Sequence, residues 1–305
     1  MMGKELESFD GVRIHYRYFR GGTSERDAPV LIFIHGLGGN SSAWEPVIRF
    51  FEKKDYPTLY FDVRGHGKSG KPRRVNAYRF ENNARDLYEI VKREGISKVI
   101  IMGHSSGGMI GLNFYKLYPE RVAGLVLMSS NYTNPLRYFL FPVHYLTYPV
   151  KLFCYLLSGV GFLFGRKKVV YTNYYLYRHS SEIYLLWRDM LGTPLEIFLW
   201  CFVELLDFDA RGWLAEIKVP VLLIAGSADW FTRPSASQYM HEKIGDSRLY
   251  MVNSTEHDIL FKRVDETSRI ILSFLEKYSI TQERQGMKKE SHTRDERVPN
   301  ARQAR

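Results

Sequence analysis

The chain has few cysteines and no long apolar run. Its 305 residues include only Cys154 and Cys201, which lie far apart in an aromatic segment. Two such thiols exclude a disulfide scaffold and a cysteine-based metal cluster. The first ten residues hold one lysine, two glutamates and one aspartate but no apolar stretch. We therefore expect no secretory signal and, by default, a cytoplasmic protein.

Acidic residues are outnumbered by basic ones, and the formal net charge is +10. Part of this excess lies in residues 281–305, where seven lysines and arginines face four acids and apolar residues are almost absent. We expect this tail to be disordered. No nucleic-acid motif is present, so a nucleic-acid partner is not expected. The remaining charge fits either a solvated basic surface or attraction to anionic lipid.

Short apolar runs alternate with amphipathic segments along most of the chain. After the turn at Asp10 and Gly11, alternation over Arg13–Tyr18 predicts a hairpin. Nearly continuous apolar runs are typical of parallel strands covered on both faces. Such strands are expected at Val30–Ile34, Thr58–Phe61, Lys98–Met102, Ala123–Met128, Val221–Ala225 and Leu249–Val252. Helices are expected at Trp44–Lys53, Glu81–Glu94, Met109–Leu117, Ser235–Lys243 and Asp265–Tyr278. The alternation predicts an α/β fold with a mostly parallel, doubly wound sheet and helices on both faces.

One long segment interrupts this alternation. About eighty residues separate Ser130 from the strand that begins near Val219, although a plain crossover needs only a dozen or two. We interpret residues 131–212 as an inserted helical cap between two core parts, 1–130 and 213–280. The cap is rich in aromatic rings and poor in charge, which favours an apolar roof over a ligand site. Its two uncharged runs are too short to span a bilayer. The possibility that the cap also contacts an anionic membrane surface stays open.

The pentapeptide Gly103-His104-Ser105-Ser106-Gly107 follows an apolar run and opens an amphipathic stretch. A strand, a sharp turn and a helix in this order form a nucleophile elbow. The turn holds the serine in a strained backbone conformation, and small residues two positions away let helix and strand approach closely. The motif therefore makes Ser105 a candidate nucleophile.

A serine nucleophile needs a base, and the base needs an acid to orient it. In sheets of this kind reacting groups gather at the carboxyl ends of the strands. Asp229 follows the strand at Val221–Ala225, and His257 follows the last strand. The rival acid position, after the preceding strand, holds Asn131, which cannot carry a fixed charge. We therefore predict Asp229 as the acid and His257 as the base.

Backbone donors for an oxyanion are predicted in a second glycine-rich turn. Ile34-His35-Gly36-Leu37-Gly38-Gly39 directly follows a strand. The Leu37 N–H, paired with the N–H of Ser106, would bind the oxyanion of an acyl-transfer intermediate. No Lys-Ser or Lys-Thr follows the glycines, so a phosphate-binding loop is not expected. Neither a metal ion nor an organic cofactor is required by this set of residues.

These motifs, together with Asp62-Val63-Arg64-Gly65-His66-Gly67-Lys68-Ser69, resemble the α/β-hydrolase superfamily over roughly residues 5–280. The resemblance is strongest to lid-bearing serine esterases and to members like monoacylglycerol lipase. It implies an eight-stranded, mostly parallel sheet. It also implies that the Asp62–Ser69 turn is a structural loop and that His35, His66 and His104 pack loops instead of reacting.

The sequence thus predicts a serine hydrolase that cleaves esters of hydrophobic acyl groups through an acyl-enzyme. Two other functions stay open. The same triad serves carbon–carbon bond hydrolases and acyltransferases, because the fold fixes neither the bond nor the acceptor. A hydrolase-fold protein that binds a ligand without catalysis is the third interpretation.

Overall fold

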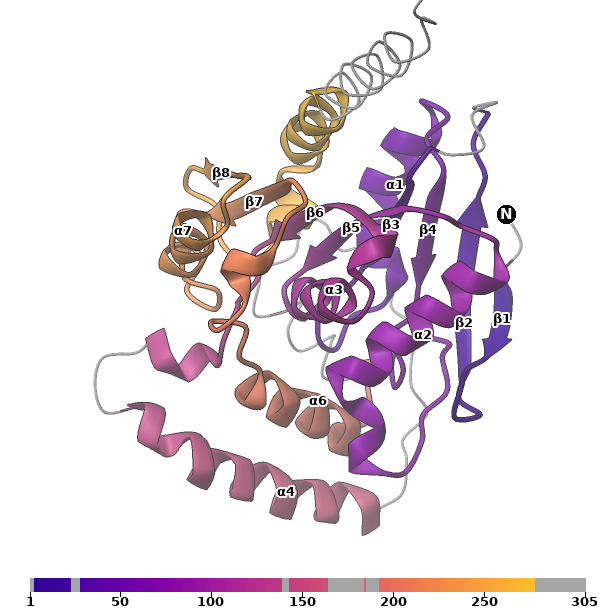
Figure 1. Cartoon of the computed structure of the whole chain (residues 1–305). Helices are drawn as coiled ribbons and strands as arrows, with labels where there is room; N and C mark the ends of the chain where they lie inside the picture. Colours follow the sequence, from indigo (N-terminus) through magenta and orange to yellow (C-terminus); the bar gives the residue numbers. More distant parts are fainter. Residues whose placement is uncertain (1–2, 23–27, 139–142, 164–183, 185–191, 278–305) are drawn as a thin grey trace, which may run out of the picture.

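The computed structural model describes residues 3–22, 28–138, 143–163, 184 and 192–277. In these residues eight strands form one sheet in the order β1-β2-β4-β3-β5-β6-β7-β8 (Figure 1). Strand β2 pairs antiparallel with both β1 and β4, and all other neighbouring strands pair parallel. The strands are β1 Lys4–Glu7, β2 Arg13–Phe19, β3 Val30–Ile34, β4 Thr58–Phe61, β5 Val99–His104, β6 Val122–Met128, β7 Val221–Gly226 and β8 Ser247–Val252. The predicted α/β class and the mostly parallel sheet are confirmed.

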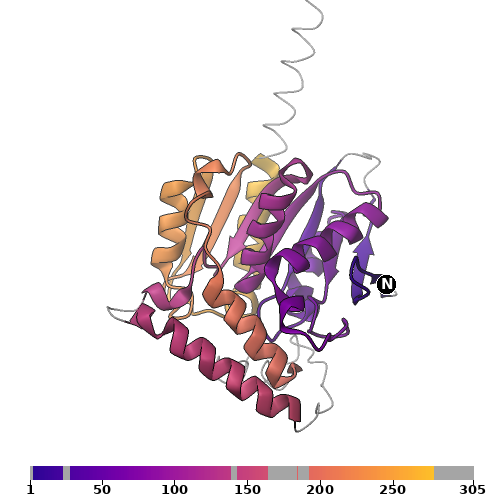
Figure 2. The same cartoon turned by 60° about the horizontal axis from the view of Figure 1, so that its bottom comes forward.

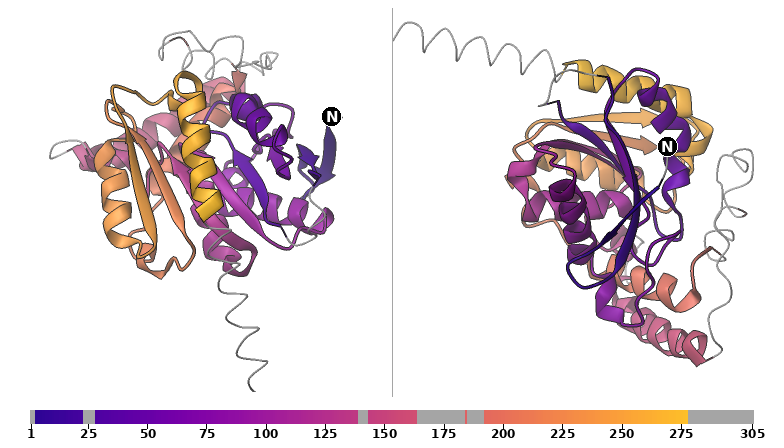
Figure 3. Two further views of the ribbon diagram at one scale, coloured as in Figure 1. Left: turned by 90° about the horizontal axis from the view of Figure 1, so that it is seen from above. Right: turned by 90° about the vertical axis from the view of Figure 1, so that its right-hand side faces the viewer.

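Helices cover both faces of the sheet (Figure 3). Two separate apolar clusters fill the layers between the helices and the sheet. On one face lie α2 (Phe80–Arg93), α3 (Ser106–Leu117) and α7 (Pro234–Lys243). On the other lie α1 (Glu45–Glu52), α8 (Ile259–Lys262) and the helical residues 264–277. Every residue of β3, β5, β6 and β7 is buried, as their continuous apolar runs predict.

The predicted elements agree with the structure except near some of their ends. The turn at Asp10 and Gly11 joins β1 to β2 as a hairpin, and the predicted strands and helices are all present. Helix α3 begins at Ser106, three residues before its predicted start at Met109, because the chain passes from the elbow directly into the helix. The tail at residues 281–305 lies outside the described residues, as does Tyr278.

The segment between β6 and β7 contains two long helices on the same side of the core, α4 (Thr147–Leu163) and α6 (Leu195–Asp207). Helix α6 lies between α4 and the core (Figure 2). Its Ile197 packs near Tyr78 of the core, whereas Leu199 and Val203 pack against Cys154 of α4. The short 3-10 turns η4 (Pro135–Tyr138) and η5 (Val143–Leu146) precede α4. Within the described part of the chain, no helix has the length and apolar content needed to cross a membrane.

Glu204 ties α6 to the core. Its Oε1 accepts a hydrogen bond of 3.1 Å from the backbone N–H of Phe80, the first residue of α2. Burial raises the pKa of Glu204 to about 7, and the nearby carboxyls of Glu81 and Asp207 act in the same direction. A carboxyl whose pKa is raised by folding stabilises the protein below its unfolded pKa. That contribution is lost as the pH rises through about 7.

We expect Glu204→Gln to reduce the pH dependence of stability. The amide keeps an oxygen acceptor for the Phe80 N–H but has no charge to bury. Between pH 5 and pH 8 the parent should lose roughly 1–3 kcal/mol of unfolding free energy through this group, allowing for its partial exposure, and the variant should not. Urea unfolding at several pH values measures the difference. Glu242→Gln, at an exposed site of α7, is the control, and equal slopes for the parent and Glu204→Gln would contradict the expectation.

Candidate active site

Ser105 lies on a sharp turn between β5 and α3. Its backbone has φ 54° and ψ −123°, a conformation that L-residues rarely adopt. A Cβ at Gly103 would lie 2.4 Å from the backbone N of Gly108, and one at Gly107 would lie 2.3 Å from the carbonyl oxygen of Ile34. Both glycines are therefore required by close backbone approach, as the motif predicts.

Asp229 and His257 are in direct contact. Asp229 follows β7, and its Oδ2 lies 2.9 Å from His257 Nδ1. Its Oδ1 accepts hydrogen bonds from the backbone N–H groups of Phe231 (3.0 Å) and Thr232 (2.8 Å). Burial alone would raise the pKa of Asp229, but the His257 imidazole and the hydrogen bonds from His257 and Thr232 outweigh it and lower the pKa. The carboxylate is thus ionised, fully buried and fixed in orientation.

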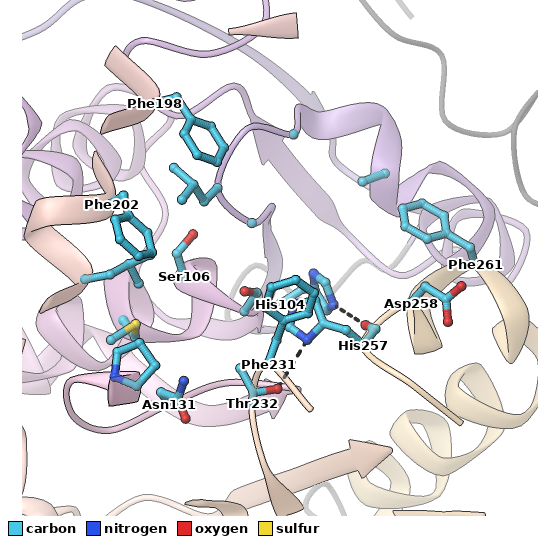
Figure 4. Close-up of a pocket in the computed structure, with 18 residues that line it drawn as sticks. His104, Ser106, Asn131, Phe198, Phe202, Phe231, Thr232, His257, Asp258 and Phe261 are labelled. Carbon is cyan, nitrogen blue, oxygen red and sulfur yellow. Dashed lines mark hydrogen bonds between the residues drawn. The ribbon is translucent and has the colours of Figure 1, made fainter. Parts of the chain in front are cut away.

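His257 lies on the loop that follows β8, and several contacts hold this loop. The Thr232 hydroxyl oxygen lies 3.2 Å from His257 Nδ1 (Figure 4). The Nε2–H of His104 donates to the carbonyl oxygen of His257 over 3.1 Å. Since Nδ1 is engaged with Asp229, Nε2 is the ring nitrogen that proton transfer would use. Burial lowers the pKa of His104 to about 3, so this bond comes from a neutral ring.

The glycine-rich loop after β3 is held against Ser105. A Cβ at Gly36 would lie 3.2 Å from Ser105 Cβ. His35 Nε2 accepts the Val63 N–H (2.9 Å), and its Nδ1 donates to the carbonyl oxygen of Gly36 (2.8 Å). His66 Nε2 accepts the Gly38 N–H at 3.0 Å. The structure therefore uses these histidines to position loops, as predicted.

The turn at Asp62–Ser69 has a structural role, which agrees with the prediction. Asp62 Oδ1 accepts the Ser41 N–H and its Oδ2 accepts the Lys68 N–H, each at 2.8 Å. The fully buried Arg64 bridges Asp86, with one N–O distance of 2.6 Å, and also contacts Asp10. The hydrogen bonds of Asp62 and the ion pairs of Arg64 keep the turn in place beside the glycine-rich loop.

Ser105 and His257 line one cavity of about 240 Å³. Leu37 and Ser106, the predicted oxyanion donors, also line it. Apolar side chains form most of the remaining wall, and four polar side chains, His104, Asn131, Thr232 and Asp258, complete it (Figure 4). The apolar residues are Ala43, Met109, Pro135, Phe198, Phe202, Leu205, Phe231 and Phe261. The cavity is thus an apolar site with a reactive set of polar groups at one wall.

Three contributions to the site were not predicted from the sequence. Thr232 donates its hydroxyl to Asp229, and its only sequence signal is the short Asp-x-x-Thr spacing of a turn. Asn131, considered only as a rival acid position, lines the cavity, as does Asp258. The side chain of Asp258 lies 2.8 Å from Lys262 Nζ.

Several other histidines and aspartates lie away from the cavity. His241 is on α7, where its Nδ1 contacts Ser247 Oγ at 2.9 Å. His15 is 3.7 Å from Asp62. Asp207 and Asp209 form surface ion pairs with Lys151 and Arg211. The side chain of His144, and all of His179 and His292, lie outside the described residues. Nowhere in the described ranges do three His, Cys, Asp or Glu side chains form a group that could hold a metal ion.

Comparisons with known proteins agree with this architecture. A family model for the alpha/beta hydrolase fold matches residues 29–153. Serine hydrolase BPHL of Homo sapiens is 24% identical over 269 residues, covering 88% of this chain and 84% of that protein. The putative carbamate hydrolase RutD of Stutzerimonas stutzeri is 27% identical over 265 residues, covering 86% and 96%.

The solved structure of the esterase EaEST from Exiguobacterium antarcticum matches with a TM-score of 0.71 at 21% identity. That match covers 90% of this chain and 100% of the esterase, and it establishes a shared fold. The strand order, the strained serine turn and the matches to hydrolases all indicate the same fold. The chain has the α/β-hydrolase fold.

Proposed function

We propose that this protein is a serine hydrolase that cleaves carboxylic esters of hydrophobic acyl groups. The observation that carries the proposal is the placement of Ser105 and the Asp229-bound imidazole of His257 on one apolar cavity. A serine hydroxyl is a weak nucleophile until an oriented base accepts its proton. The ionised Asp229 supports that orientation, because it binds the Nδ1 side of the ring.

In this mechanism Ser105 Oγ attacks the ester carbonyl carbon while His257 Nε2 accepts the hydroxyl proton. The backbone N–H groups of Leu37 and Ser106 would stabilise the resulting oxyanion, each by a few kcal/mol. Collapse of the tetrahedral intermediate breaks the bond to the alcohol, which leaves with the proton from His257. Water then attacks the acyl-enzyme, His257 accepts a proton from that water, and the carboxylic acid departs as Ser105 regains its proton.

The cavity wall supports an apolar acyl group. Phe198, Phe202 and Leu205 come from α6, and Met109 comes from α3. A cavity of about 240 Å³ is smaller than the sites that hold drug-sized ligands, which measure roughly 300–1,000 Å³. Short and medium acyl chains therefore fit best.

A series of p-nitrophenyl esters from acetate to palmitate tests this proposal. We expect kcat/KM to rise about three- to fourfold per added methylene until the cavity is filled, since each buried methylene contributes about 0.8 kcal/mol. Palmitate should then be a poorer substrate than a medium-chain ester. A flat series, or one with acetate as the best substrate, would contradict an apolar acyl site.

Product analysis in the presence of an added alcohol distinguishes hydrolysis from transfer. Free acid as the main product is the expected result. A new ester of the added alcohol would assign acyl transfer instead. Failure to turn over any ester, combined with ligand-dependent thermal stabilisation, would point to a non-catalytic binding protein.

A further inference from the structure

Exposed apolar side chains gather on and just before α4. Each has a relative exposure of 40% or more, although large apolar residues elsewhere in the described ranges are mostly buried. We call this set the α4 face: Tyr145 (64%), Leu146 (50%), Tyr148 (80%), Leu152 (60%), Phe153 (63%), Tyr155 (40%) and Leu156 (66%). Such a contiguous patch is unusual on a protein surface and marks an interaction site.

The spacing places these residues on the side of α4 that faces away from α6. Tyr148, Leu152 and Tyr155 are three to four residues apart and therefore share one side of the helix. The opposite side is occupied, because Cys154 packs against Leu199 and Val203 of α6. Helix α4 is thus apolar on both sides, but only one side is used to hold it on the protein. Figures 1 and 2 show α4 as the outermost helix of the insertion.

The stretch of sequence that contains the α4 face carries charge of one sign. From Asn131 to Ser181 the sequence contains no aspartate or glutamate, but it contains six lysines and arginines. Lys151, the one charged residue within Thr147–Leu163, lies 2.6 Å from Asp207 of α6 and so sits at the edge toward the core. A partner surface that accommodates apolar and tyrosine side chains and attracts cations would complement this segment.

We propose that the α4 face docks on a lipid bilayer that carries anionic headgroups, with α4 lying in the plane of the interface. Tyrosine suits this position, because its ring enters the acyl boundary while its hydroxyl stays among the headgroups. The excess of cations in residues 131–181 supplies attraction to the headgroups. Helix α4 is the outermost helix of its segment in Figures 1 and 2, and the excess of cations in that segment favours an anionic lipid layer over a second, equally cationic copy of the chain. This inference is independent of the proposed ester hydrolysis.

Co-sedimentation with large unilamellar vesicles tests the proposal with the full chain. Vesicles of phosphatidylcholine with about one third phosphatidylserine are compared with vesicles of phosphatidylcholine alone. We expect binding to the mixed vesicles, at least tenfold weaker binding to the neutral ones, and weakening of the first by added salt. A Ser105→Ala background prevents any cleavage of lipid acyl chains during the measurement.

Leu152→Gln/Leu156→Gln is the informative variant, because both side chains point away from the packed side of α4. It should reduce the vesicle partition coefficient at least tenfold without changing the thermal midpoint. Leu117→Gln/Tyr250→Gln alters two apolar residues of 39% and 42% exposure elsewhere and should change binding less than twofold. Equal binding of the two variants, or no binding by the parent, overturns the proposal. A dimer of the parent in light scattering that the α4 variant abolishes would instead assign the face to self-association and would also overturn it.

Discussion

Ser105→Ala is expected to abolish ester hydrolysis and labelling by fluorophosphonates while the protein stays folded. The change removes one oxygen atom, and that atom is the proposed nucleophile. We expect kcat to fall on the order of 10⁵-fold, since what then remains is catalysis by the cavity and the oxyanion donors alone. Steady-state kinetics with the best p-nitrophenyl ester and gel detection of a fluorescent fluorophosphonate measure the two losses.

Ser254→Ala is the matched control for this variant. Ser254 also has a left-handed backbone, with φ 50°, but its side chain is exposed and does not line the cavity. Rate and labelling should both be unchanged there. Circular dichroism and the thermal midpoint establish that Ser105→Ala is folded. Labelling that persists in Ser105→Ala would place the nucleophile elsewhere.

Asp229→Asn should lower kcat by roughly 10³–10⁴-fold at neutral pH. The reason lies in the hydrogen bonds around the carboxylate. Oδ1 accepts two backbone N–H groups, from Phe231 and Thr232, so the amide oxygen of asparagine must take that position. The amide NH₂ then faces His257 Nδ1, where Oδ2 stands in the parent. To accept a hydrogen bond from this NH₂, the His257 ring must have a lone pair on Nδ1 and therefore carry its proton on Nε2. In that tautomer Nε2 cannot accept a proton from Ser105.

Asp258→Asn is the control for the loss of a carboxylate from the same cavity. Asp258 follows His257 directly, but its side chain forms an ion pair with Lys262. We expect a change of less than tenfold in kcat. A loss as large as that of Asp229→Asn would assign the orienting role to Asp258. Because the pKa of Asp229 is lowered, its orienting charge should persist under mildly acidic conditions and be lost only as the pH falls through that lowered value.

The strands and helices of the core were predictable because burial dictates their composition. Runs such as Val30–Ile34 must be apolar throughout when helices cover both faces, so their bounds follow from hydrophobicity. The start of α3 was not predictable from periodicity, since Ser106–Gly108 belongs to the helix only because Ser105 bends the chain. The lateral order of the strands depends on long-range pairing, which no local pattern encodes.

The contact between Asp229 and His257 was predictable from chain order, because both residues directly follow parallel strands. The contribution of Thr232 was not, since it depends on how the turn after Asp229 folds back. The orientation of α4 could not be predicted from the sequence either. A helix that is apolar on all sides gives no periodic signal, and only its packing against Leu199 and Val203 identifies the outward side.

The imidazoles of His66 and His104 remain uncharged in ordinary buffers. Burial lowers the pKa of both His66 and His104 to about 3, and it lowers that of His35 as well. Protons added between pH 8 and pH 5 will therefore not disturb the bond from the Gly38 N–H to His66 or the bond from His104 to the carbonyl of His257. A bell-shaped or sigmoidal rate profile recorded over that interval therefore reflects the reacting groups and Glu204 of α6, whose pKa is about 7, and not these two imidazoles.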